Sequence, residues 1–126
     1  MSKPILLSIV ESRGHPDFCD LYDRLGFDHQ WVTSMRKALG FVKKTAPDYV
    51  VAEFFYGYGN NYAGVNISNL DVFLYSLEKY APQAKVIALV QKPERQHADR
   101  LNEIIPYHGI AQYPVRESDM KNLLGS

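Results

Sequence analysis

Hydrophobic residues in this chain follow two alternating periods, one typical of strands and one typical of helices. Residues 5–10 form a short, nearly continuous apolar run, as in a strand buried on both faces of a parallel sheet. The next apolar residues recur at the spacing of an amphipathic helix, at Phe18, Leu21, Tyr22 and Leu25. Repeated along the chain, the alternation predicts strands over residues 5–10, 30–33, 49–55, 85–90 and 110–115, and helices over residues 18–25, 35–44, 70–81, 93–105 and 117–124.

Capping and turn residues agree with these boundaries. Gly26 follows the first predicted helix, and Ser34 stands where an N-cap of the second helix belongs. Ser68 or Asn69 is the expected N-cap of the third helix, which Pro82 ends.

Strands that alternate with helices predict βαβ crossovers, and therefore a parallel sheet with helices on both faces. Residues 1–126 are accordingly expected to form a single α/β domain with three layers. In doubly wound sheets the functional crevice lies beyond the carboxyl ends of the strands. The segments to examine are residues 11–14, 53–66, 90–92 and 115–117.

Composition and charge exclude several classes of protein. With 46% hydrophobic and 22% charged residues the chain is an ordinary globule, so global disorder is not expected. Lysine and arginine number 14, as do aspartate and glutamate, and this balance disfavours a general nucleic-acid binder. The first apolar run is too short for a membrane span and precedes charged residues, so no membrane association is predicted.

The cysteine and histidine pattern gives no support to a disulfide scaffold or a metal site. Cys19 is the single cysteine, so no internal disulfide is possible and a reducing cytoplasm is the expected location. The four histidines are scattered without a ligand spacing, at His15, His29, His97 and His108. We therefore predict neither a metal nor a cofactor.

Three stretches of the chain resemble response-regulator receiver domains, in the right order and spacing. Residues 46–53, APDYVVAE, resemble the run that leads into the phosphoacceptor aspartate of that family. Residues 69–82 resemble the following helix, and residues 109–116, GIAQYPVR, resemble the strand that carries the family's aromatic and lysine positions. The resemblance implies a flavodoxin-like (βα)5 fold with a doubly wound five-stranded parallel sheet.

The same resemblance implies that the phosphorylation chemistry is degenerate. Glu53 stands at the phosphoacceptor position, where its extra methylene displaces the carboxylate by roughly 1.5 Å. The magnesium-binding acidic pair of the family aligns with Ile9 and Val10, or after a short shift with Glu11 and Ser12. Neither alignment retains two carboxylates, so no tight magnesium site is predicted.

Three further positions of the family's pocket can be placed. Val90 replaces its hydroxyl residue and has no proton to donate. Arg116 replaces its lysine, and Tyr113 occupies its aromatic switch position, which we expect to be uncoupled because Val90 lacks a hydroxyl. Two interpretations of Glu53 stay open: imitation of a phosphorylated aspartate, or a partly buried acid satisfied by Arg116 or by loop amides.

Residues 56–66, YGYGNNYAGVN, are predicted to form an inserted loop that is longer than the family's. Tyrosine beside glycine and asparagine is typical of adaptable recognition surfaces, and the candidates are Tyr56, Tyr58, Asn60, Asn61 and Tyr62. A purely structural role, covering the end of the sheet, is equally open.

The leading functional hypothesis is a phosphorylation-independent pseudo-receiver that binds a protein partner in two-component-type signalling. By family analogy it uses the face formed by helix four, strand five and helix five, either for another protein or for a homodimer. The alternative is a flavodoxin-like domain that binds a small nucleotide-like ligand, with the 56–66 loop as its lid. An enzyme is not expected, because no nucleophile-base pair or metal motif can be assembled from the sequence.

Overall fold

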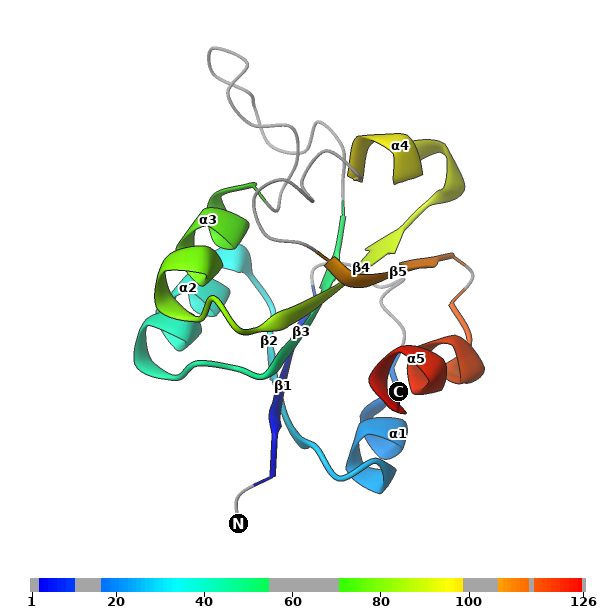
Figure 1. Cartoon of the computed structure of the whole chain (residues 1–126), viewed down its shortest axis with the longest axis horizontal. Helices are drawn as coiled ribbons and strands as arrows, with labels where there is room; N and C mark the ends of the chain where they lie inside the picture. The colour runs from blue at the N-terminus through cyan, green and yellow to red at the C-terminus, as the bar shows by residue number, and fades with distance from the viewer. Residues whose placement is uncertain (1–2, 11–16, 55–70, 99–106, 114, 126) are drawn as a thin grey trace.

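The computed structural model describes residues 3–10, 17–54, 71–98, 107–113 and 115–125. Within them lie five strands, β1 (Ile5–Ile9), β2 (Asp28–Val32), β3 (Tyr49–Glu53), β4 (Lys85–Val90) and β5 (Tyr107–Gln112). All neighbouring strands are parallel, in the order β2-β1-β3-β4-β5 (Figure 1). The predicted α/β fold class and parallel sheet are confirmed.

The helices are α1 (Cys19–Arg24), α2 (Met35–Lys44), α3 (Asp71–Tyr80), the 3₁₀ turn η2 (Lys92–Glu94), α4 (Arg95–Ala98) and α5 (Glu117–Gly125). Ser34 caps α2 as predicted, because its hydroxyl accepts a hydrogen bond of 3.2 Å from the Lys37 backbone N–H. Gly26 ends α1 with a φ of 89°, and the backbone N–H groups of Gly26 and Phe27 bond back to Asp23 and Tyr22. This is a Schellman motif, which favours glycine at that position.

Several predicted boundaries need correction. β2 begins at Asp28 rather than at residue 30, because Asp28 pairs with Ile5 at the start of β1. β5 covers Tyr107–Gln112 rather than residues 110–115, since its register on β4 shifts between Val86 and Ile87 and admits His108. The helix predicted at residue 93 begins instead with the turn η2, and its continuation past residue 98 lies outside the described residues.

Two separate apolar cores hold the layers together, one on each face of the sheet. On one face, α2 and α3 pack over a core that includes Val42, Phe73 and Leu77. On the other face, α1 and α5 lie side by side over a core that includes Tyr22 and Met120 (Figure 1). Strand residues alternate between these cores, so the central strands are buried on both faces, as their continuous apolar runs predict.

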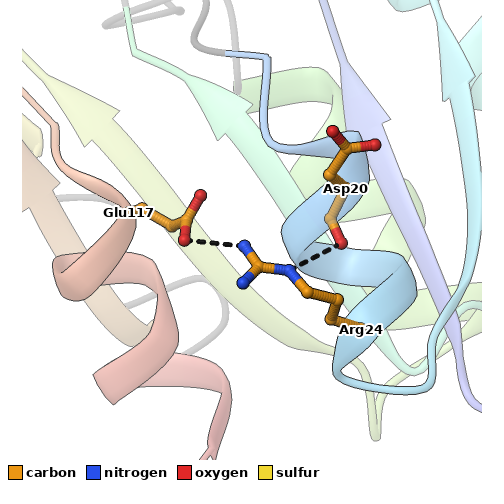
Figure 2. Close-up of polar contacts among 3 residues, drawn as sticks. All are labelled: Asp20, Arg24 and Glu117. Atoms are coloured by element: carbon orange, nitrogen blue, oxygen red, sulfur yellow. Dashed lines mark hydrogen bonds and ion pairs between the residues drawn. The ribbon is translucent and has the colours of Figure 1, made fainter.

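Arg24 joins the two helices of the second face (Figure 2). Its guanidinium lies 2.7 Å from the Glu117 carboxylate at the start of α5, and its Nε donates to the Asp20 carbonyl at 3.4 Å. Both partners of the ion pair are exposed, so it adds little to stability, and the apolar core that α1 and α5 share is what holds the two helices together. Among the described residues, no helix is long and apolar enough to cross a membrane.

Candidate functional site

The carboxyl ends of β3, β4 and β5 bring together three of the residues predicted from the sequence. Glu53 is the last residue of β3, Val90 is the last residue of β4, and Tyr113 directly follows β5. Because these strands are adjacent and parallel, their ends lie at one edge of the sheet. These three residues therefore lie at the carboxyl edge of the sheet, where the α/β pattern predicts them.

Glu53 is a buried acid with a specific hydrogen-bond partner. The residue is 1% exposed, and its Oε2 accepts a hydrogen bond of 3.0 Å from the Tyr113 hydroxyl. A buried carboxylate is costly unless it receives hydrogen bonds. No buried side-chain nitrogen or oxygen among the described residues lacks a partner, which shows that the burial of Glu53 is compensated.

Tyr113 is held in place by the backbone of the neighbouring strand. Its N–H donates to the Val90 carbonyl at 2.8 Å and so extends the ladder one residue beyond β5. Burial raises the pKa of the half-buried Tyr113 hydroxyl well above its usual range, and the charge and hydrogen bond of Glu53 raise it further. The phenol thus stays protonated at neutral pH and acts as the donor to Glu53.

Val90 contributes no polar group to this edge. It is fully buried in the core beneath α2 and α3. Its side chain has no hydroxyl to donate. The polar contact at this edge is made directly between Glu53 of β3 and Tyr113, which follows β5. Tyr113 nevertheless reaches Glu53, a contact that the comparison with the receiver pattern did not predict.

Arg116 has a structural role that differs from the expected pairing. Within the described part of the chain, no ion pair joins Arg116 to Glu53, and the Arg116 side chain is exposed. Its backbone N–H instead donates to the Asp119 carboxylate at 2.9 Å, one half of a capping box that starts α5. Arg116, which was one of the partners expected for Glu53, is therefore not its partner. The observed donor to Glu53 is the Tyr113 hydroxyl, which the sequence did not suggest.

Of the two magnesium-site alignments, the one without a gap falls on described residues. Ile9 is fully buried and Val10 partly buried, and both are apolar, so the alignment without a gap supplies no carboxylate. Glu11 and Ser12 lie outside the described residues, as do Tyr56, Tyr58, Asn60, Asn61 and Tyr62 of the predicted loop. The described residues include no cluster of three acidic, histidine or cysteine side chains that could hold a metal ion.

A second polar cluster was not found from the sequence. Ser8 of β1 and His29 of β2 lie 2.9 Å apart, from Oγ to Nε2, beneath α1. Two signals were available: Ser8 interrupts an otherwise apolar strand, and His29 and Trp31 alternate, so both face the same side of a strand. Neither signal reveals that the two strands pair side by side.

Comparisons with known proteins identify the fold of the chain. Neither a protein-family model nor a curated protein sequence matches it. Among solved structures, a response regulator receiver protein from Sinorhizobium medicae is 17% identical, with a TM-score of 0.70 over 98% of this chain and 92% of that one. A response regulator receiver domain protein from Clostridium thermocellum is 16% identical, with a TM-score of 0.71 over 97% and 91%.

A third structure extends the same likeness. The signal receiver domain of a modulated diguanylate cyclase from Desulfovibrio desulfuricans is 13% identical, with a TM-score of 0.71 over 98% of this chain and 92% of that one. At such identities the likeness establishes the fold alone. The chain has the flavodoxin-like fold of receiver domains, and the resemblance noted in its sequence is confirmed at that level.

Proposed function

We propose that this receiver-fold chain is a phosphorylation-independent pseudo-receiver, which presents a fixed surface to a protein partner in signalling. The observation that carries the proposal is the 3.0 Å hydrogen bond from Tyr113 to the buried Glu53 carboxylate. This bond joins the phosphoacceptor position to the switch-like aromatic position without any phosphoryl group. The site and the surface beside it are then coupled by residues already present in the chain.

Glu53 is poorly placed to accept a phosphoryl group. The longer glutamate displaces its carboxylate, and a misplacement of about 1 Å can cost about a hundredfold in rate. Its Oε2 already accepts a hydrogen bond, and its 1% exposure leaves little access for a phosphate donor and an in-line attack. The apolar side chains of Ile9, Val10 and Val90 give no oxygen ligand to a magnesium ion.

The partner surface is assigned by analogy to α4, β5 and α5. Tyr113 lies between β5 and α5, so a contact that fixes its ring also fixes the edge of this face. A second copy of the chain is one candidate partner, in line with the homodimer expected from the sequence. The 56–66 loop, both as a recognition surface and as a lid over a small ligand, stays a prediction, as do the absence of enzyme activity and the cytoplasmic location.

The experiment is phosphoryl transfer from a small donor. The purified chain is incubated with acetyl phosphate and magnesium, and intact-mass spectrometry is performed before and after treatment with hydroxylamine, which cleaves acyl phosphates. We expect no hydroxylamine-sensitive phosphoprotein, whereas a working receiver domain treated in parallel gains one phosphoryl group. Stoichiometric labelling that disappears in the Glu53→Gln variant would overturn the proposal, because glutamine keeps the side-chain length and cannot be phosphorylated.

A further inference from the structure

A hollow of about 330 Å³ lies between α1 and the edge strand β2, and none of the described residues that line it belongs to the Glu53 site. Its volume falls at the lower end of the range for pockets that bind small molecules. The described residues that line it come from β1, α1, β2 and the segments beside them, and they are Ser8, Val10, Asp17, Phe18, Cys19, Tyr22, His29 and Trp31.

The floor of this hollow is polar and ordered. Ser8 is 2% exposed, and its hydroxyl lies 2.9 Å from Nε2 of His29. The ring of Tyr22 packs edge-on against the imidazole of His29. Ser8 and His29 are thus fixed relative to one another at the bottom of the hollow, with the Tyr22 ring beside them.

The walls are aromatic rings in edge-to-face and tilted arrangements. The ring centroids of Tyr22 and His29 are 4.7 Å apart, and those of Phe18 and Tyr22 are 6.3 Å apart. The ring centroids of Trp31 and His29 are 5.6 Å apart. Trp31 is 61% exposed, so most of its surface stays in water. An exposed tryptophan beside a hollow is a ready binding surface, because its π-face attracts cations as well as apolar groups.

Among the described residues that line this surface, carboxylates outnumber ammonium groups. A second hollow of about 470 Å³ shares Cys19, His29 and Trp31 with the first, and its described lining residues add Asp23, Asp28 and the cation Lys3. Together with Asp17, three carboxylates of described residues face one lysine, which favours a positively charged ligand.

Cys19 does not turn this surface into a metal or nucleophile site. A hydrogen bond to Asp17 raises the pKa of the Cys19 thiol to about 11, and burial and the nearby carboxylates act in the same direction. The thiol is therefore protonated at neutral pH and is neither a strong nucleophile nor a metal ligand. The described residues contain no metal-binding cluster here either.

We propose that this hollow binds a small organic cation, an amine or quaternary ammonium with a compact apolar body. The cationic head would lie against the exposed face of Trp31 and near the Asp17 carboxylate, and the apolar groups would fill the space between Phe18 and Tyr22. Aromatic rings combined with carboxylates recognise alkylammonium groups by cation–π attraction and charge. This proposal is independent of the phosphorylation-independent function, since it uses a different part of the sheet.

The test uses choline as the probe and Trp31 as the reporter. Trp31 is the single tryptophan of the chain, so a change in tryptophan fluorescence during a titration reports on this hollow. The comparison compound is the uncharged isostere of choline in which a tert-butyl group replaces trimethylammonium. We expect saturable quenching by choline. The neutral isostere is expected to bind with a Kd at least about fivefold higher than that of choline. Equal binding of both compounds, or no saturable response to choline, would overturn the proposal.

Two matched pairs of variants locate the site, with binding followed by ligand-observed NMR so that Trp31 can be changed. Asp17→Asn is expected to raise the Kd for choline about threefold or more, while Glu78→Gln on the distant helix α3 leaves it unchanged. Trp31→Leu is expected to abolish the signal, while Tyr75→Leu, which removes a ring of equal 61% exposure on α3, leaves it unchanged. Undiminished binding in both Asp17→Asn and Trp31→Leu contradicts the assignment.

Discussion

The hydrogen bond between Tyr113 and Glu53 is the contact on which the proposed function depends. Removal of its donor leaves a buried carboxylate with one hydrogen bond fewer, which is costly because water cannot replace the lost partner at 1% exposure. We expect Tyr113→Phe to lower the free energy of unfolding by about 1–3 kcal/mol, measured by urea denaturation.

The matched control makes the same chemical change at another half-buried tyrosine. Tyr49 contacts Phe27 and His108 through its ring. Tyr49→Phe keeps these ring contacts, so its effect is expected to stay within about 0.5 kcal/mol. Equal effects of Tyr49→Phe and Tyr113→Phe would show that Glu53 does not depend on the Tyr113 hydroxyl.

The raised pKa of Tyr113 gives this contact a defined dependence on pH. In the unfolded chain the phenol ionises near its usual pKa of about 10, whereas burial and the Glu53 charge keep the folded phenol protonated to higher pH. The stabilising effect is thus complete below pH of about 10 and is lost as the pH rises above it, because the unfolded state then releases a proton that the folded state retains.

The corresponding measurement is urea denaturation of the wild type and Tyr113→Phe at neutral pH and above pH of about 10. We expect the stability advantage of the wild type to shrink with rising pH. Other tyrosines titrate in both proteins, so their effect cancels in the difference. A constant difference across this range would mean that the pKa of Tyr113 is not raised by folding.

The sequence predicts the position of Glu53 but not its hydrogen-bond partner. The identity of Glu53 at the end of a buried strand follows from the apolar run that leads to it. Its partner does not, because Tyr113 follows β5, which is separated from β3 by β4, and a local pattern does not show that the Tyr113 hydroxyl reaches across to Glu53. Ser8 and His29 were missed for a related reason, since strand pairing and not sequence distance brings them together.

At the scale of elements, the helix ends at Ser34 and Gly26 follow local chemistry and agree with the prediction, whereas the limits of β2 and β5, unlike those of β4, do not. The Ser34 cap and the Gly26 stop depend on a few neighbouring atoms. The limits of β2 and β5 depend on register against β1 and β4, including the shift between Val86 and Ile87. That register involves residues distant in sequence, which a local pattern does not encode.

Two glycines test the helix assignments, because the same change to alanine is expected to have opposite effects on stability at the two positions. Gly26 has a φ of 89°, so Gly26→Ala forces an alanine into the left-handed region and is expected to cost about 1 kcal/mol of unfolding free energy. Gly40 lies inside α2 with open space around its Cβ position, so Gly40→Ala is expected to add about 0.5–1 kcal/mol. Thermal or urea denaturation measures both, and the same sign for both variants would contradict the assigned helix ends.

At the scale of the whole molecule, α5 and α2 lie on opposite faces of the sheet. α1 and α5 share one core and an ion pair, and α5 also borders the face assigned to a partner. If a second copy binds through α4, β5 and α5, the exposed Lys121 on α5 is close to the interface, while the exposed Lys43 on α2 is on the other side of the sheet.

Sedimentation analysis of charge-reversed variants checks this assignment. We expect Lys121→Glu to weaken self-association at least several-fold and Lys43→Glu to leave it unchanged, because a reversed charge acts mainly on groups within about 10 Å at moderate salt. A monomeric wild type would remove the homodimer from the proposed function. An equal effect of both variants would place the contact elsewhere.

The most direct test of the account compares NMR spectra of the labelled chain with and without magnesium and acetyl phosphate. If Glu53 and Tyr113 already couple the pocket to β5, the backbone signals of β4 and β5 and the ring signals of Tyr113 stay unchanged by the donor. The same backbone signals are expected to move in Tyr113→Phe, which shows that the spectrum senses the contact. Donor-dependent shifts in the wild type that grow with a gain of one phosphoryl group would contradict the account.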